Sequence, residues 1–135
     1  MTYHRQIRVE FNHCDPAKIV FFPRYYEMAN SVIENFFREE VNYSYRRMMD
    51  EGFGAPTVKI DTEFRHPSML GDLLDWTLRV TKVGTSSATF ELAAVGDGTL
   101  RLTTTHVLVW LDPQGRATPW PDAIRERLTA FLETT

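Results

Sequence analysis

Asp15 is the residue with the clearest potential for chemistry, because of what stands on either side of it. It follows a strand-like run and opens an apolar loop that two prolines, Pro16 and Pro23, enclose. A long helical pattern begins directly after this loop. A carboxylate can act as a general base or nucleophile, and backbone N–H groups at a helix start favour negative charge. The segment can therefore present a carboxylate and backbone donors to one bound atom.

Three alternatives are open for this segment. Asp-Pro is a common loop opener, so Asp15 can simply cap a turn. The neighbouring Cys14 is a possible nucleophile, but the sequence offers it no paired histidine and orienting partner, which favours a buried thiol. His13 would face the same side of an extended segment as Asp15. It either shapes the environment of the acid or is a partly buried strand histidine.

Other chemistries have weaker support. The four histidines show no spacing typical of a metal site, and neither a glycine-rich phosphate loop nor a Gly-x-Ser-x-Gly elbow occurs, so we expect no metal and no cofactor. The net charge is −3 and there is no Lys/Arg block, which argues against nucleic-acid binding. No stretch has the length of a membrane span, and the single Cys14 fits a reducing cytoplasm.

Hydrophobic periodicity predicts the elements that position Asp15. Residues 5–13 alternate as a strand, and a helix of about four turns follows from Pro23 to about Arg38. Pro23 suits a first helical turn, since the N–H that it lacks would have no partner there. The wide apolar face of this helix comprises Met28, Ala29, Val32, Ile33, Phe36 and Phe37.

For the rest of the chain, the pattern predicts four strands between two short helices. A helix is expected over Tyr45–Glu51, and a last amphipathic helix opens at Pro121-Asp122. Turn signals separate four runs of alternating residues. These runs begin at Val58, Leu74, Ala88 and Leu100. We therefore expect a single α+β domain over residues 1–135, with a five-stranded antiparallel sheet wrapped around one long central helix, plus a C-terminal helix.

The chain resembles the hotdog-fold acyl-CoA thioesterases of the 4-hydroxybenzoyl-CoA thioesterase-like family. The most specific similarity is Phe11-x-x-Cys14-Asp15-Pro16-Ala17-x-Ile19-Val20-Phe21-Phe22-Pro23-x-Tyr25. Two further segments, Phe64–Asp72 and Val80–Ser87, are similar to a strand entry with its Gly-Asp turn and to the hairpin near the CoA portion. The resemblance covers nearly the whole chain and implies the hotdog fold and hydrolysis of an acyl-CoA thioester.

The resemblance also implies roles for individual residues. Asp15 matches the catalytic carboxylate, which acts as nucleophile or as general base, and the backbone N–H at about Phe22 matches the donor to the thioester oxygen. The expected substrate-binding residues are Phe21, Tyr25, Asn30, His13, Lys82, Ser86 and Ser87. Bulky aromatic residues around the loop favour aromatic or short-to-medium acyl groups over long chains.

The sequence departs from the aromatic-specific members in two places. Asn30 replaces an acid that helps to hold a ring hydroxyl, and the hairpin at Gly84-Thr85-Ser86 lacks a run of basic residues, which leaves Lys82 as the nearest cation. The identity of the acyl group and the binding of the CoA phosphates therefore stay open. Lys18, where the family often has glycine, is expected to be tolerated.

Two other functions are considered. A hotdog hydratase needs an acid paired with a histidine, and no histidine follows Asp15 before His66. A non-catalytic module that binds acyl-CoA or another apolar ligand is the main alternative, although the intact Asp15 argues against it. We expect a homo-oligomer, a dimer or tetramer, in which the loop at 15–22 faces the 56–67 region of its mate.

Overall fold

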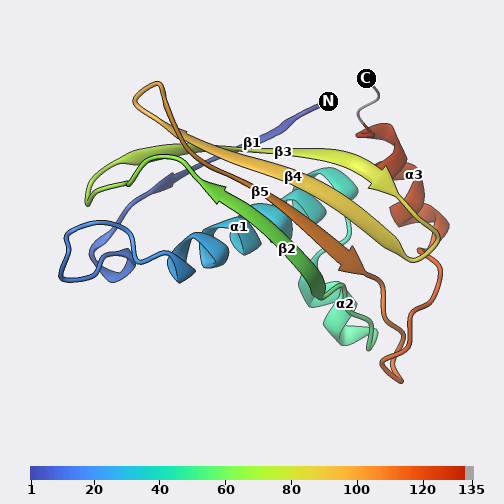
Figure 1. Cartoon of the computed structure of the whole chain (residues 1–135). Helices are drawn as coiled ribbons and strands as arrows, with labels where there is room; N and C mark the ends of the chain where they lie inside the picture. Colours follow the sequence, from blue (N-terminus) through green and yellow to red (C-terminus); the bar gives the residue numbers. More distant parts are fainter. Residues whose placement is uncertain (133–135) are drawn as a thin grey trace.

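Five antiparallel strands form one sheet that arches over a long helix, as the computed structural model shows (Figure 1). The structure describes residues 1–132. The strand order is β1-β3-β4-β5-β2, so β1 and β2 are the two edges. The strands are β1 (Tyr3–Arg8), β2 (Thr57–Phe64), β3 (Leu73–Val83), β4 (Ser87–Gly96) and β5 (Thr99–Val109). The expected α+β architecture, with its five-stranded antiparallel sheet and C-terminal helix, is confirmed.

Helix α1 (Pro23–Phe36) packs its apolar face against the sheet, as the periodicity predicted. Pro23 occupies the first turn, and the predicted core residues from Met28 to Phe37 are buried. The α-helix ends slightly earlier than expected and continues as a wider π-helical turn, η2 (Phe37–Val41). The extra residue in this turn accompanies the burial of both Phe36 and Phe37.

The first strand is shorter than the sequence alternation suggested. β1 ends at Arg8, and a single 3₁₀ turn, η1 (Phe11–His13), replaces the expected end of the strand. The chain leaves the sheet after Val9, and Phe11 is 85% exposed although it continues the alternation. Alternation alone could not predict this end, because pairing with β3 stops at the Arg8–Leu73 pair.

Two short helices close the rest of the core. Helix α2 (Tyr45–Asp50) contributes Met48, and α3 (Asp122–Ala130) packs Ile124 and Leu128 against the end of the sheet opposite to residues 14–22 (Figure 1). The sequence predicted this last amphipathic helix, which opens at Pro121-Asp122. None of the helices in the described part of the chain is long and apolar enough to cross a membrane.

The edge strand β2 is exposed on the face that the other strands turn toward the helix. Val58, Ile60 and Phe64 are 59%, 43% and 49% exposed, whereas the facing residues of β5 are buried. Helix α1 therefore covers the middle of the sheet and leaves the β2 side open.

Candidate active site

Residues 14–22, here called the Asp15 loop, form a closed turn between η1 and α1. Cys14 and Val20 pair as an antiparallel bridge, and the Asp15 N–H donates to the Ile19 carbonyl at 3.1 Å. The Phe21 N–H donates to the His13 carbonyl at 2.9 Å. These cross-links return the chain beside its own start, so Asp15 and the beginning of α1 lie at the same end of the molecule.

The Asp15 carboxylate is half-buried and has one bond to the protein. Its Oδ1 accepts a hydrogen bond from the Ala17 N–H at 2.9 Å, and its carbonyl accepts one from the Lys18 N–H at 2.9 Å. The turn-capping role considered above is therefore present. Within residues 1–132, no hydrogen bond or ion pair involves Oδ2, so a second oxygen can receive a proton or attack a carbonyl.

Lys18 adopts a backbone conformation that glycine prefers. Its φ is 70°, in the left-handed region where a Cβ is strained. This explains why a glycine suits the position and shows that the turn tolerates lysine. The strain is local to the Asp15 loop, between Asp15 and Ile19.

The start of α1 has one free backbone donor. The N–H groups of Phe21, Arg24 and Tyr25 donate to His13, Phe21 and Phe22 carbonyls, respectively, and Pro23 has no N–H. Among the described residues, the Phe22 N–H is thus the only donor from 21 to 25 without an acceptor. It lies at the positive end of the helix dipole, where a developing oxyanion is stabilised.

An apolar groove of about 320 Å³ adjoins the Asp15 loop. Two of its walls are the rings of Phe22 and Phe64, whose centroids are 6.2 Å apart. The remaining lining comes from Ile19, Val20, Tyr25, Arg65, His66 and Pro67. The predicted substrate-binding residue Tyr25 lines the groove and is otherwise buried, whereas Phe21 is exposed and contacts Phe22. The neighbouring Tyr26 does not line the groove, and its hydroxyl donates a hydrogen bond to Thr62.

His13 and Cys14 have structural partners that bear on their predicted roles. His13 lies in η1 rather than in a strand, and its Nδ1 accepts a hydrogen bond from the Glu10 N–H at 2.8 Å. No hydrogen bond or ion pair joins His13 to the Asp15 carboxylate within the described residues. The Cys14 Sγ lies 3.8 Å from the Glu10 carbonyl oxygen, and the thiol is half-buried.

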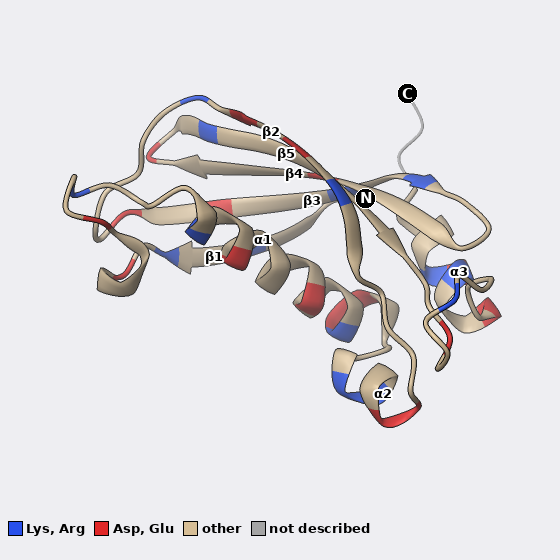
Figure 2. Cartoon of the chain, turned by 60° about the horizontal axis from the view of Figure 1, so that its bottom comes forward, with Lys and Arg blue, Asp and Glu red and all other residues tan. Residues whose placement is uncertain are grey.

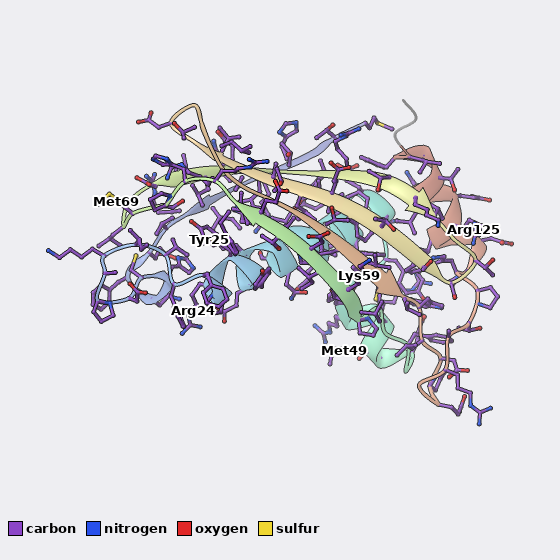
Figure 3. All side chains as sticks on the ribbon, viewed as in Figure 1. Arg24, Tyr25, Met49, Lys59, Met69 and Arg125 are labelled. Carbon is purple, nitrogen blue, oxygen red and sulfur yellow. The ribbon has the colours of Figure 1, made fainter. Side chains whose placement is uncertain are left out.

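The predicted CoA-binding residues lie at the other end of the sheet. Lys82, Ser86 and Ser87 flank the β3–β4 turn, beside α3, whose Arg125 donates to the Gly84 and Thr85 carbonyls at 2.5 and 2.9 Å. Figure 3 shows Arg125 at one end of the molecule and Tyr25 with Met69 toward the other. From Leu73 to Lys82, strand β3 alone spans roughly 30 Å at its usual rise. One protomer therefore does not bring these residues to Asp15.

Asn30 and the charged groups complete the predicted set. Asn30 is exposed on α1, one turn beyond Tyr26, and its amide has no partner in residues 1–132. Basic and acidic residues are spread over several elements and do not form a single-sign face (Figure 2). No group of three His, Cys, Asp or Glu side chains in the described part of the chain is placed to bind a metal.

Sequence reasoning missed two residues that hold the Asp15 loop. Ser68 is fully buried, accepts the Tyr25 hydroxyl at 2.9 Å and binds the Val20 N–H through its carbonyl at 2.8 Å. The buried Arg101 supports the loop that carries Ser68. The Phe64–Asp72 segment signalled Ser68 only as part of a motif, and nothing in the alternating pattern around Arg101 pointed to burial.

Solved structures share this fold over almost their whole length. A gentisyl-coenzyme A thioesterase superposes with a TM-score of 0.84 at 24% identity, covering 93% of this chain and 99% of that one. A 1,4-dihydroxy-2-naphthoyl-CoA thioesterase from Synechocystis gives 0.88 at 20% identity, with 96% of both chains covered. A Staphylococcus aureus protein solved in complex with CoA gives 0.91 at 15% identity, covering 100% and 88%. The architecture is the hotdog fold of these proteins.

Curated protein sequences give no match to the chain. A protein-family match spans residues 9–128 and so includes the Asp15 loop, α1 and all strands after β1. The match confirms the thioester-hydrolase class expected from the segment around Asp15. The chain belongs to the thioesterase-like superfamily.

Proposed function

We propose that the protein hydrolyses acyl-CoA thioesters to the free acid and CoA, with Asp15 as the catalytic carboxylate and the Phe22 N–H as the oxyanion donor. As a general base, Asp15 takes a proton from water while the water oxygen bonds to the thioester carbon. As a nucleophile, its oxygen forms an acyl-aspartyl anhydride, which water then hydrolyses. In both routes the C–S bond breaks and the departing thiolate is protonated to CoA.

The observation that carries the proposal is the free Phe22 N–H at the start of α1, beside a loop that leaves one Asp15 oxygen without a partner. Hydrolysis of a thioester builds negative charge on the carbonyl oxygen, and a fixed donor at a helix N-terminus stabilises that charge without reorganising. A loop acid that only capped its turn would not require a neighbouring unused donor.

The acyl group is proposed to bind in the groove between Phe22 and Phe64. Its aromatic walls suit a ring or a short-to-medium chain, and its volume of about 320 Å³ is at the small end for ligand sites. Two of the structural neighbours are named as thioesterases of aromatic acyl-CoA substrates, which supports the same preference. We expect Phe21 and Asn30, both exposed, to contact substrate from the rim.

A homo-oligomer, a dimer or dimer of dimers, is proposed to complete the site. The exposed apolar face of β2 would be buried by a second copy, and the sheet edge would gain hydrogen-bond partners. The Asp15 loop already contacts its own chain at Phe64 and Ser68, and we propose that the mate's 56–67 region closes the other side. The cytoplasmic location rests on the single Cys14 and stays a prediction.

The CoA portion is proposed to reach Lys82, Ser86 and Ser87 of the partner protomer, since those of the same chain lie at the far end of the sheet. Mixed dimers of Asp15→Asn and Lys82→Gln chains test this arrangement at low substrate concentration. If the site combines the two chains, the mixture regains one intact site per dimer. If each site used a single chain, mixing would restore nothing.

A non-catalytic acyl-CoA-binding module is the second candidate, because the groove and an exposed apolar edge would serve binding alone. A screen of benzoyl, phenylacetyl and short- to long-chain acyl-CoA thioesters separates the two functions. We expect turnover that Asp15→Asn lowers by about a hundred-fold or more, the scale for loss of a positioned acid–base group. Folding should survive, since a capping carboxylate contributes about 1 kcal/mol.

Binding without turnover in the screen would support the module instead. Near-wild-type hydrolysis by well-folded Asp15→Asn would make the carboxylate structural. A palmitoyl-CoA specificity constant above those of all aromatic and short thioesters would reject the proposed acyl preference. Oxygen-18 from solvent that enters Asp15 in a single turnover would identify the carboxylate as nucleophile.

A further inference from the structure

Arg101 is a charged side chain buried at the end of the sheet that carries the Asp15 loop. It is 7% exposed, and all three of its guanidinium nitrogens donate hydrogen bonds. Nη1 donates to the Pro67 carbonyl at 3.1 Å and to Asp72 Oδ2 at 2.8 Å, Nη2 to the Gly96 carbonyl at 2.9 Å and Nε to the Thr99 carbonyl at 3.3 Å. A buried charge is tolerated only with such full pairing.

The space around this guanidinium is closely fitted. A Cβ added at Gly96 would lie 2.8 Å from Arg101 Nη2 and 2.9 Å from its Cζ. The absence of a side chain at position 96 therefore lets the guanidinium approach the backbone of β4. Arg101 is fixed in one position by four acceptors and a glycine, and a fixed group can define the position of what it binds.

What Arg101 binds is the loop at residues 65–72. Its carbonyl accepts hydrogen bonds from the Arg65 and His66 N–H groups at 2.8 and 3.1 Å. Its partner Asp72 accepts a bond from the Met69 N–H at 2.9 Å on the same Oδ2. The Met69 N–H bond, with the Arg101 guanidinium, lowers the pKa of Asp72 below its usual value. Both ends and the middle of the loop are therefore tied to one residue pair.

The 65–72 loop in turn holds the Asp15 loop. The Ser68 carbonyl accepts the Val20 N–H, and Ile19 and Met69 form an antiparallel bridge. Ile19 is also the residue whose carbonyl accepts the Asp15 N–H at 3.1 Å. Ser68 further accepts the hydroxyl of Tyr25, in the first turns of α1, so this serine touches the segments on both sides of Phe22.

We propose that the Arg101–Asp72 pair is a positioning unit, which sets the placement of Asp15 and the Phe22 N–H through the 65–72 loop and Ser68. The inference rests on the proposed function for its kinetic consequence, although the positioning can be measured without it. Arg101 is not among the residues that line the groove. A misplacement of the reacting groups by about 1 Å can lower the rate a hundred-fold. A pair that holds the Asp15 loop in place can therefore affect the rate without contacting the reacting groups.

The test uses three variants of the full chain. Arg101→Ala removes the guanidinium. Arg101→Lys keeps the positive charge but loses the planar set of N–H donors, and Arg47→Ala is the control. Arg47 also pairs with a carboxylate, Glu51, and lies over the Tyr43 ring, but it belongs to α2 and has no contact with either loop. Each variant is assayed for kcat and KM on the best thioester of the screen, below its melting temperature.

An activity-independent readout is the reaction of Cys14 with a thiol reagent. Cys14 is the only cysteine of the chain and pairs with Val20 inside the Asp15 loop. We expect Arg101→Ala to lower kcat by about 10- to 100-fold with KM within about twofold. The same variant should label roughly tenfold faster at Cys14, because the loop opens more often. Arg101→Lys should show smaller changes of both kinds, and Arg47→Ala neither.

Chemical rescue separates positioning from general damage. A hollow of about 380 Å³, lined by Gly71, Asp72, Asp97 and Arg101, opens beside the guanidinium. Millimolar ethylguanidinium should enter it in Arg101→Ala, slow Cys14 labelling and restore part of kcat, with no effect on Arg47→Ala. If Arg101→Ala does not fold, Arg101→Lys decides through the same two measurements.

The outcomes distinguish the two proposals. Folded Arg101 variants with wild-type kcat and wild-type Cys14 labelling would overturn the positioning role while leaving the thioesterase intact. A loss of stability alone, equal to that of Arg47→Ala, would overturn it too. A protein that turns over no thioester but still shows fast, rescuable Cys14 labelling in Arg101→Ala would reject the proposed function and retain the positioning.

Discussion

Lys18 illustrates how a single residue can strain the segment that matters most. Its φ of 70° places a Cβ in the left-handed region between Asp15 and Ile19. Two other non-glycine residues, Asn42 and Asp97, share positive φ, but Asn and Asp visit this region at lower cost than lysine does. The turn geometry around Asp15 is therefore maintained by its hydrogen bonds despite an unfavourable residue.

We expect Lys18→Gly to stabilise the protein by about 0.5–1 kcal/mol. Relief of left-handed strain gives about 1–2 kcal/mol, and the greater flexibility of unfolded glycine offsets about half of it. Urea unfolding measures the difference, with Asn42→Gly as the matched control that should change little. An equal gain in both variants would show that Lys18 is no more strained at its positive φ than Asn42 is. Hydrolysis should be unaffected, because the Lys18 side chain is exposed.

His106 is a second residue with a measurable consequence. It is buried on β5 between Ile60 and Phe90 of the neighbouring strands, packs against the Tyr26 ring, and its Nε2 has no hydrogen-bond partner. Burial lowers its pKa from about 6.5 to about 4. Between these two pH values the folded state thus binds fewer protons than the unfolded state. The contribution of neutral His106 to the free energy of unfolding is therefore fully present above about pH 6.5 and is lost as the pH falls toward 4.

The melting temperature of the wild type should therefore fall more steeply from pH 7 to pH 4 than that of His106→Leu. Leucine has a similar size and no proton to bind, and its apolar neighbours can accept it. Carboxylates such as Asp72 contribute equally in both proteins, so the difference between the two curves isolates His106. Parallel curves would mean that the histidine is already protonated, or already hydrated, when folded.

At the scale of the elements, periodicity predicted what depends on local pattern. Helix α1 and strands β2 to β5 repeat their apolar residues at helical or strand spacing, and the structure has them. The end of β1 was wrong, because Phe11 continues the alternation after the chain has left the sheet. Placement of β2 beside β5 depends on contacts between distant segments, which no local pattern contains.

The candidate site likewise divides into residues that a local pattern predicts and residues that only contacts between distant segments bring together. The residues of the Asp15 loop are adjacent in sequence, so a short motif predicted Asp15 and Phe22 together. In the simple alternation of β5, Arg101 falls on the face opposite to the core residue Leu102, so the pattern predicts exposure. The pairing of β4 with β5 shifts register at Ala94/Val95, and the guanidinium lies beside Gly96, the pairing partner of the core residue Leu74. Its burial follows from four carbonyl and carboxylate acceptors contributed by separate segments, which only the folded chain assembles.

Gly96→Ala tests how tightly β4 and β5 are fitted at this point. The added Cβ would contact the Arg101 guanidinium and Leu74 Cδ2 at 2.8–2.9 Å, and neither neighbour is free to withdraw. We expect a loss of roughly 1–3 kcal/mol in the free energy of unfolding, the range for overpacking. Gly54→Ala, whose Cβ would have only Pro56 Cδ at 4.0 Å, should stay within about 0.5 kcal/mol.

Urea denaturation of both glycine variants gives the comparison directly. Equal stability of Gly96→Ala and Gly54→Ala would show that Arg101 can shift without cost. Such freedom would also weaken the argument that Arg101 positions the 65–72 loop, so the stability measurement bears on the kinetics.

At the scale of the whole molecule, the exposed apolar side of the sheet at β2 is the feature that the fold of a single chain does not explain. Strand β2 presents Val58, Ile60 and Phe64 to solvent on the face of the sheet that elsewhere covers α1. Within residues 1–132, its outer backbone edge has no partner strand. A long apolar edge strand invites pairing with another chain. A second copy of this chain would cover the apolar face and place new residues beside the groove at Phe22 and Phe64.

Ile60→Arg should therefore convert the oligomer to monomers and reduce thioesterase activity together. An arginine at the centre of β2 would place a charge in the contact, and two-fold symmetry would place its copy nearby, which costs several kcal/mol of like-charge repulsion. Leu100→Arg is the control, because Leu100 is exposed to a similar degree, 38% against 43%, but lies beyond the end of β2.

Sedimentation velocity at micromolar concentration measures the assembly, and the thermal melt shows whether each variant is folded. A wild-type protein that sediments as a monomer would exclude the oligomer at once. A dimeric, fully active Ile60→Arg would instead place the interface on a surface other than the exposed face of β2.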